Sequence, residues 1–188
     1  MGASPTRLVR KGRESMAIKV AKFLHVADGL QHKQFSVGGH DMLSSLDDLD
    51  PTYKQLIDGP FHTNFGVIGN DGKINLTPMW FDYEDDKVLV NVAAHRKKVE
   101  WIRARPDLTM LIVNPANMYH WISFRVHVVK EILEDDPAEG ALVTAQLDKI
   151  WTKYTGNEPP YGLRDPEIDE RRVLFICDID RIATFGKP

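Results

Sequence analysis

A run of basic residues between an expected strand and an expected helix is the strongest chemical feature of the sequence. The run His95-Arg96-Lys97-Lys98 follows the apolar stretch 87–93, and Ala94 lies at the junction. Cations at the start of a helix oppose its dipole, so the helix itself gains nothing from them. An anion is well bound there, by free backbone N–H groups and a guanidinium together. The pattern predicts a phosphate-binding site, with a solvated basic turn as the alternative interpretation.

A second chemical feature lies in the expected strand that precedes this region. Thr77-Pro78-Met79-Trp80-Phe81 places a proline in a strand, which costs a hydrogen bond of the ladder. Beside the proline stand broad aromatic rings and a thioether, which are good walls for a flat ring. A phosphate site next to an aromatic groove suggests a flavin-like or nucleotide cofactor.

Other catalytic patterns are missing from the sequence. It contains no GxGxxG, GxxxxGK[ST], GxSxG or HExxH motif. Cys177 lies in an apolar stretch and is interpreted as a buried structural thiol. His120 and His127 are an odd number of residues apart on an expected strand, so they point to opposite faces, and no metal site is predicted. The acidic residues of 134–136 and 165–170 are interpreted as solvated ends of helices and loops.

The elements expected to position these residues are mostly strands joined by hairpins. Asp50-Pro51 starts a short helix, and Asn70-Asp71-Gly72 is a strong hairpin signal. A second helix is expected over 95–105, with Val99, Ile102 and Trp101 turned inward. The third runs over 136–156 and is capped by Asp136. Strands are expected over 61–69, 73–83, 87–93, 107–115, 119–133 and 172–186. Antiparallel strands in these numbers close most easily into a small barrel.

Composition limits the class of protein. The 188 residues suffice for one domain, and 43% hydrophobic and 27% charged residues are typical of a soluble globular chain. A net charge of −3 argues against a nucleic-acid-coating protein. There is no apolar run long enough to span a membrane, and a single cysteine excludes an internal disulfide. A cytoplasmic location is expected.

The N-terminal part differs from the rest in charge. Residues 1–40 carry seven Lys or Arg and two acidic residues. An organelle presequence and N-myristoylation at Gly2 are alternatives to the preferred interpretation, which is a basic extension over 1–45 outside the core. The stretch 17–27 could form a short helix or strand, and the glycines of 38–40 are expected to break the chain. The domain is expected over 46–188, so a chain that starts at Met42 should fold, dimerise and bind cofactor.

Residues 46–186 resemble the pyridoxamine 5′-phosphate oxidase-like superfamily, the FMN-binding split β-barrels that include deazaflavin (coenzyme F420)-dependent reductases. Four stretches carry the resemblance: FGVIGNDGKINLTPMWF, RKKVEWIRARPDLTMLIV, YHWISFRVHVVKEI and ERRVLFICDIDRI. The family's Pro-x-Trp-Phe pattern is matched at 78–81. In its phosphate-binding pattern Arg96 and Lys98 match, Ile102 stands for a leucine, and Trp101 replaces an asparagine.

The resemblance implies a mainly β fold, an antiparallel Greek-key split β-barrel with flanking helices. It also implies a homodimer with each cofactor in a groove between the protomers, which Tyr119, His120 and Trp121 approach from the opposite subunit. The residues expected to bind the cofactor on this basis are Pro78, Met79, Trp80, Phe81, Ala94, His95, Arg96, Lys97, Lys98, Trp101, Ile102, Tyr119 and Trp121.

The function that the resemblance implies is hydride transfer between coenzyme F420 or FMN and a small organic substrate. The cofactor carries the hydride, so no catalytic side chain is required. Lys97 and Arg103 extend the positive surface and slightly favour F420, which has an anionic tail. One alternative is an FMN-dependent oxidase of pyridoxamine phosphate, whose second basic set could come only from Arg164, Arg171, Arg172 and Arg181. Another is a non-catalytic flavin or haem carrier, with His95 or His120 as the axial ligand of a haem.

Overall fold

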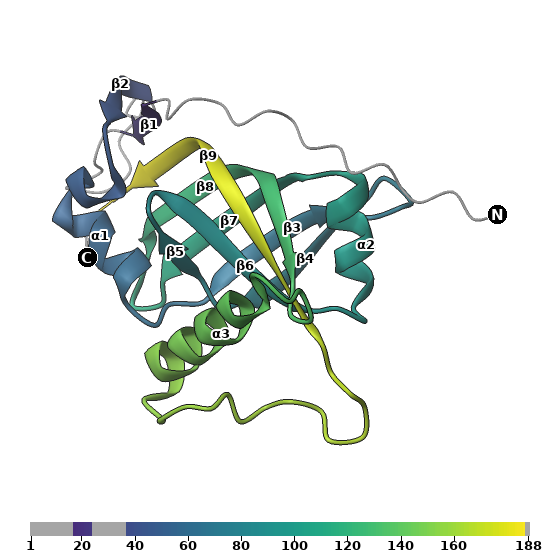
Figure 1. The fold of residues 1–188 in the computed structure, drawn as a ribbon. Coiled ribbons are helices and arrows are strands. Elements are labelled where there is room, and N and C mark those ends of the chain that lie inside the picture. The colour runs from purple at the N-terminus through teal and green to yellow at the C-terminus, as the bar shows by residue number, and fades with distance from the viewer. Residues whose placement is uncertain (1–16, 24–36, 187–188) are drawn as a thin grey trace.

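The computed structural model describes residues 17–23 and 37–186, and Figure 1 shows a β-barrel flanked by helices. The described elements follow one another along the chain as β1 (Ile18–Phe23), β2 (Val37–Leu43), a short 3-10 helix (Leu46–Asp48), α1 (Pro51–Asp58), β3 (Thr63–Ile68), β4 (Ile74–Met79), β5 (Asp82–Glu84), β6 (Lys87–Ala93), α2 (Lys97–Ala104), β7 (Asp107–Asn114), β8 (Asn117–Leu133), α3 (Gly140–Thr155) and β9 (Arg172–Phe185).

The long strand β9 joins the parts of the barrel. The strands are ordered β2-β1-β9-β8-β7-β3-β4, and the hairpin β5-β6 attaches through β6 to β9. The first half of β9 pairs with β6, from Val88↔Cys177 to Ala93↔Arg172. Its second half pairs with β1 in parallel, whereas the other described strand pairs are antiparallel. The structure confirms the predicted split β-barrel.

The core lies inside the barrel and follows from strand alternation. Phe65, Ile112, Phe124 and Phe175 are fully buried and come from four different strands. On β6, burial extends to every residue from Val88 to Ala93, because α3 covers the outer face of this strand. A strand that is covered on both faces needs no polar alternation.

Two tight turns depend on glycine. The hairpin between β3 and β4 forms where it is predicted, with Gly69 N–H donating to the Lys73 carbonyl at 2.8 Å. Gly72 takes the positive φ of +78° that this turn requires. At the start of α3, a Cβ on Gly140 would lie 2.2 Å from the carbonyl oxygen of Glu134, so only glycine permits this close approach.

Two predicted elements have different bounds in the structure. The expected strand 73–83 is interrupted at Trp80-Phe81 and forms β4 and β5, because Phe81 turns into the core. The helix expected from Asp136 begins at Gly140. The Asp136 carboxylate instead accepts hydrogen bonds from the N–H groups of Ala138 and Glu139, which closes a turn before the helix.

The N-terminal strands correct the expectation that residues before 46 lie outside the core. Ile18 and Val20 of β1 are 5% and 1% exposed and belong to the main core cluster. The glycines of 38–40 do not break the chain but lie within β2, which pairs with β1. The division at residue 45 stays a prediction, and Gly2 and the rest of 1–16 lie outside the described residues.

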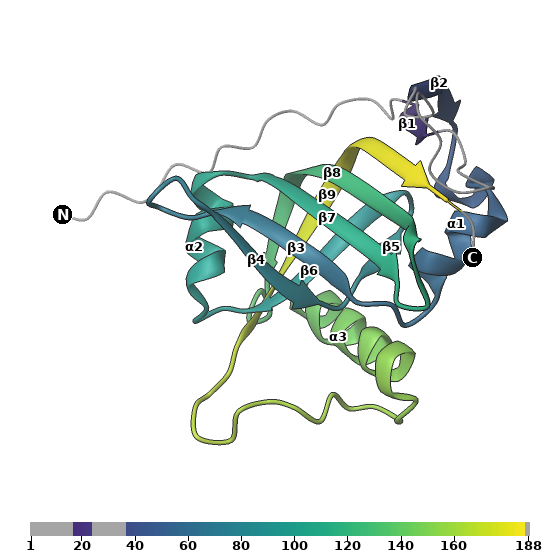
Figure 2. The same cartoon turned by 180° about the vertical axis from the view of Figure 1, so that it is seen from behind.

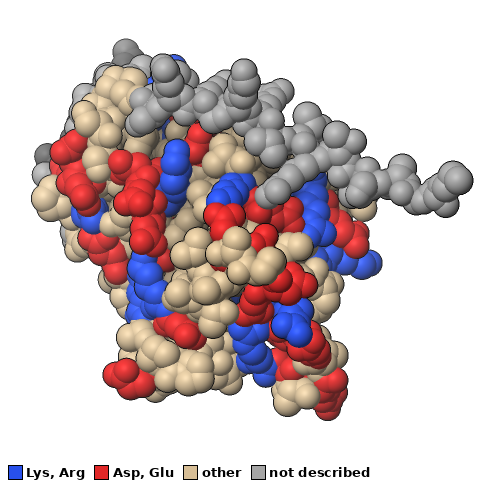
Figure 3. Space-filling model, in the orientation of Figure 1, with Lys and Arg blue, Asp and Glu red and all other residues tan. Residues whose placement is uncertain are grey.

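Within 17–23 and 37–186, no helix has the length and apolarity needed to cross a membrane. The same residues hold no group of three or more His, Cys, Asp or Glu side chains that could bind a metal ion. Figure 3 shows Lys and Arg interspersed with Asp and Glu over the face that carries α3.

Candidate functional site

The basic run lies at the N-terminus of α2, where β6 ends. Ala94 N–H donates to the Arg171 carbonyl at 2.8 Å, which fixes this junction to the segment before β9. Arg96 is the N-cap residue, and within the described part of the chain its side chain makes no capping hydrogen bond. The side chains of His95, Arg96 and Lys97 are exposed. First-turn N–H groups have no acceptor inside their own helix, so those of Lys97 and Lys98 can bind an anion.

Lys98 connects this helix to the end of β4. Its Nζ donates to Thr77 Oγ1 at 2.9 Å and lies 3.5 Å from the Met79 sulfur. It also lies 5.6 Å from the centre of the Phe65 ring. Burial, followed by the nearby Arg96 charge, lowers the pKa of Lys98. The two predicted features, the basic run and the aromatic strand end, are therefore in direct contact.

The residues of the strand end differ in exposure. Pro78 is exposed, and Met79 and Trp80 are half-buried. The Trp80 ring stacks on Tyr154 of α3, with centroids 5.0 Å apart and planes 10° apart. Phe81 is a correction to the predicted set: its side chain is 1% exposed and belongs to the core. Its backbone N–H donates to the Tyr154 hydroxyl at 2.8 Å, and its backbone carbonyl accepts from Lys153. Both backbone groups of Phe81 are therefore bonded to α3.

On α2, the structure separates two neighbouring residues of the predicted set. Ile102 is 0% exposed and packs in the core, as predicted for this helix, so its side chain does not face the surface where a cofactor would bind. Trp101 is half-buried and lies with Lys97 in the wall of a cavity of about 510 Å³ beside the β3-β4 turn. Arg105 Nη1 donates to the Gly69 carbonyl at 2.9 Å and fixes this turn against α2.

The segment at the start of β8 lies apart from β4 within one chain. Strands β7 and β3 lie between β8 and β4, a separation of about 14 Å at three strand spacings. Tyr119 is exposed, and Trp121 stacks on Phe185 with centroids 5.8 Å apart. His120 is fully buried: its Nε2 donates to the Thr52 carbonyl and its Nδ1 accepts from Asn114. His120 therefore cannot approach a partner's cofactor or ligate a haem in this fold.

A second cavity, of about 380 Å³, adjoins Met79 and Trp80 on the side of α3. Trp80 and Tyr161 line this cavity and belong to an aromatic cluster with Trp151 and Tyr154, which the sequence motifs do not include. Burial is the main cause that raises the pKa of Tyr154 to about 12. The spacing of Trp151 and Tyr154 on one helix face is the signal that could have indicated this cluster.

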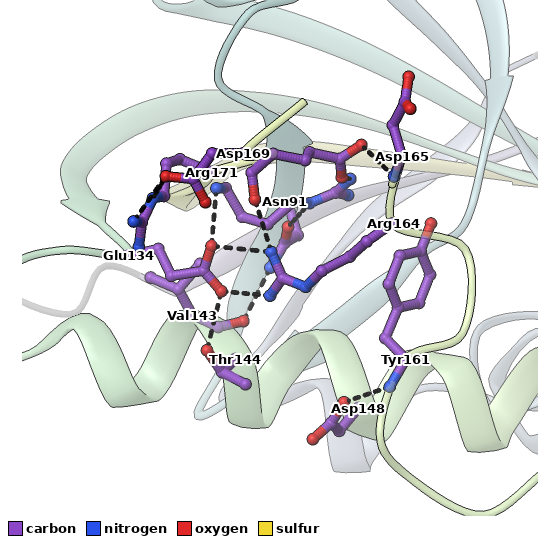
Figure 4. A network of polar contacts seen from close by, with 12 residues as sticks. Asn91, Glu134, Val143, Thr144, Asp148, Tyr161, Arg164, Asp165, Asp169 and Arg171 are labelled. Atoms are coloured by element: carbon purple, nitrogen blue, oxygen red, sulfur yellow. Dashed lines mark hydrogen bonds and ion pairs between the residues drawn. The ribbon is translucent and has the colours of Figure 1, made fainter. Parts of the chain in front are cut away.

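Beside this cavity, Glu134 is the centre of a polar network rather than a solvated end (Figure 4). Its carboxylate pairs with the Arg164 guanidinium and accepts from the Thr144 hydroxyl and the Arg172 N–H, each at 2.9 Å. Burial alone would raise its pKa, but the hydrogen bonds from Arg164, Thr144 and Arg172 outweigh burial and lower it. Glu170 is half-buried, and its carboxylate pairs with Arg172. The interpretation of 134–136 and 165–170 as solvated ends is therefore wrong for these two residues.

The single cysteine lies in neither the basic run nor the aromatic cluster. Cys177 is fully buried, and burial raises the pKa of its thiol, as expected for a structural thiol.

Comparison with solved structures places this arrangement in a known fold. An F420 reductase superposes with a TM-score of 0.57 at 21% identity, over 71% of this chain and 98% of that chain. A conserved hypothetical protein of Mycobacterium tuberculosis superposes with a TM-score of 0.53 at 20% identity, over 70% of this chain and 80% of that chain. HutZ, the haem storage protein of Vibrio cholerae, superposes with a TM-score of 0.52 at 11% identity, over 73% of this chain and 96% of that chain.

No protein-family model and no curated protein matches the sequence. At these identities the structural likenesses establish the fold. The chain has the split β-barrel fold of the pyridoxamine 5′-phosphate oxidase-like proteins, as the sequence motifs predict. That fold serves a reductase in one of these proteins and haem storage in another, so the activity must be argued from the site.

Proposed function

We propose that this protein is an oxidoreductase that transfers hydride between a bound flavin-type cofactor and a small organic molecule. The observation that carries the proposal is the contact of Lys98 with Thr77 and Met79. It brings an anion-binding helix start and an aromatic strand end together, as a cofactor with a phosphate and a flat ring requires.

The residues at this place fit such a cofactor. The exposed cations Arg96 and Lys97 and the first-turn N–H groups of α2 would hold its phosphate. Lys98 would donate from the β4 side, and Met79 and Trp80 would cover the ring and exclude water from it. When bound, the cofactor supplies the redox chemistry. The protein's task is then to bind, to orient and to keep the ring dry.

The structure weakens the preference for F420 over FMN. The sequence predicts that Arg103 extends the positive surface, but the Arg103 guanidinium pairs with Glu131, with a 3.0 Å bond from Nε. Of these two cations, Lys97 is exposed to solvent, whereas Arg103 is held by Glu131. We therefore retain both cofactors as candidates for this site.

The oxidation of pyridoxamine phosphate is less well supported, because its second basic set is not assembled. Arg164 and Arg172 pair with Glu134 and Glu170, and Arg171 pairs with Asp169. A haem carrier remains an alternative through the exposed His95, since His120 is engaged on both ring nitrogens.

We also propose a homodimer, which would place Tyr119 and Trp121 against a partner's cofactor. The support is an apolar stripe on the outer face of β4-β3-β7-β8, the sheet in the foreground of Figure 2. Ile74 and Leu76 of this stripe are 71% and 68% exposed. Strand pairing places the half-buried Leu111, Val113 and Trp121 on the same face. A second copy would cover this apolar surface.

Titration of the cofactor-free protein with FMN and with F420, followed by fluorescence, tests the proposed function. We expect saturable binding of one of the two. A protein purified with its cofactor would absorb at about 450 nm for a flavin, at about 420 nm for the deazaflavin, or in a sharp Soret band for haem. Binding of neither cofactor, or a Soret band, would contradict the proposal.

A further inference from the structure

The second cavity has the size and walls of a pocket for a small organic molecule. Its volume of about 380 Å³ falls in the range of ligand pockets, which is roughly 300–1,000 Å³. Met79 and Trp80 form one wall, Leu147 and Ile150 of α3 a second, and Tyr161 and Leu163 a third. The Trp80 and Tyr161 rings lie nearly perpendicular, at 85° with centroids 6.3 Å apart. Such walls favour an apolar molecule of one or two rings.

One end of the cavity is polar. Arg172 lies there, with Nε bonded to Asn91 Oδ1 at 2.9 Å and Nη1 to Glu170 Oε1 at 2.8 Å. Its guanidinium also stacks over the Tyr161 ring at 5.5 Å. Among the described residues that line the cavity there is no carboxylate. Glu170 balances the charge of Arg172, so this end adds no net positive charge for a phosphate, but the N–H groups of the guanidinium still suit a hydrogen-bond acceptor better than a cation.

The wall formed by residues 156–171 is held in place by bonds to the barrel and to α3. Tyr161 N–H donates to Asp148 Oδ1 at 2.8 Å, and Trp151 Nε1 donates to the Glu158 carbonyl at 3.1 Å. Arg164, three residues after Tyr161, is bound by Glu134 (Figure 4). The pocket is thus formed before any ligand arrives, which lowers the entropic cost of binding.

We infer that this cavity is the substrate-binding pocket of the protein. Its substrate is an apolar molecule of one or two rings that carries a hydrogen-bond acceptor, such as a carbonyl or sulfonyl oxygen, toward Arg172. The inference rests on the proposed function, because Met79 and Trp80 are the residues that also border the proposed cofactor ring. Met79 and Trp80 would then border both the proposed cofactor site and the pocket, and Tyr161 and Leu163 would determine which ring systems fit.

Binding of 1-anilinonaphthalene-8-sulfonate to the cofactor-free protein tests this inference. Leu163 lines the cavity and is 60% exposed, so in Leu163→Trp the larger indole would narrow the opening of the pocket, and we expect the affinity for the sulfonate probe to fall about tenfold or more. Leu142→Trp is the matched control, because Leu142 is 53% exposed on α3 and does not line the cavity. N-Phenyl-1-naphthylamine has the same rings without the sulfonate, and we expect it to bind about three- to tenfold more weakly than the sulfonate probe.

The outcomes separate this inference from the proposed function. Loss of probe binding in Leu163→Trp, with FMN or F420 affinity unchanged, supports a separate substrate pocket. Loss of both affinities would make the cavity part of the cofactor site and overturn the inference. Probe binding that is absent, or equally strong in Leu163→Trp and Leu142→Trp, would also overturn it. If the protein binds neither cofactor while Leu163→Trp still loses the probe, the proposed function fails and the pocket assignment stands.

Discussion

At the scale of single residues, the candidate site depends on the different situations of three neighbouring cations. Arg96 and Lys97 extend into solvent, whereas Lys98 is turned toward β4 and bonded to Thr77. A solvated cation loses little when it is removed, but a ligand held by it loses a charge-assisted bond. Arg96 is therefore the residue at which binding can be changed with the least effect on folding.

Replacement of Arg96 by alanine should weaken cofactor binding by about 1.5–3 kcal/mol, the contribution of a hydrogen bond to a charged group. The thermal midpoint should stay unchanged, because the side chain is exposed. Lys19→Ala removes an exposed cation from β1 and should leave the affinity as it is. Fluorescence titration measures both variants, and equal affinities of Arg96→Ala and the unaltered protein would refute the phosphate assignment.

A second residue-scale prediction concerns Glu134. Its pKa is lowered in the folded protein, so its contribution to stability is fully present above its ordinary pKa near 4.5 and is lost as pH falls through the folded value. The free energy of unfolding of Glu134→Gln should be about 2 kcal/mol lower at pH 7, because Arg164 and Thr144 lose a charged acceptor. Thermal melts from pH 7 to pH 3 should show the two proteins converging at the acid end. A constant difference over that range would contradict this role of the carboxylate.

At the scale of elements, β1 is the strand whose position changes the interpretation of the chain. It pairs in parallel with the end of β9, from Val20↔Ile182 to Lys22↔Thr184. A chain that starts at Met42 would lack this strand and expose one edge of β9 together with part of the core. The expectation that such a chain behaves like the full one is therefore replaced by an expected loss of stability.

Val20→Ala tests the packing of β1 without removing the strand. Val20 is 1% exposed, so its truncation should lower the free energy of unfolding by about 1–3 kcal/mol. The adjacent Lys19 is exposed, and Lys19→Ala should change that free energy by less than about 0.5 kcal/mol. Urea denaturation measures both. Equal midpoints for the two variants would mean that β1 does not contribute to the core in solution.

At the scale of the whole molecule, the question is what covers the outer face of β4-β3-β7-β8. Its exposed residues Ile74 and Leu76 lie on an edge strand, and the side chain of Trp121 lies on the same face two strands away from β3. Burial of such a stripe between two copies would form two equivalent grooves by symmetry. Each groove would then contain the α2 start of one protomer and the β8 start of the other.

Leu76→Asp should convert the proposed dimer into a monomer at micromolar concentration, because a carboxylate would be buried in an apolar interface. Leu142→Asp places the same charge on an exposed position of α3 and should leave the dimer intact. Sedimentation measures both variants. Cofactor affinity should fall with the dimer in Leu76→Asp, and a monomeric variant with full affinity would refute the shared groove.

Local patterns in the sequence determined the parts of this protein that depend on neighbouring residues. The hairpin at 70–72, the start of α1 at Asp50-Pro51, the helix after the basic run and most strands follow from turn chemistry and side-chain alternation. The split-barrel fold could be predicted from motifs that combine these signals. The basic run and the aromatic strand end were also visible, because each is contiguous along the chain.

Only the tertiary structure decided which of these residues are free to act. It turned Phe81 and Ile102 into the core, engaged His120 and Arg103 with partners of their own, and placed Glu134 at the centre of a network. It also brought α3 and residues 156–171 over Met79 and Trp80, which created the second cavity. These outcomes depend on contacts between residues far apart in sequence, whose register is set by the packing of the whole barrel and not by local propensity.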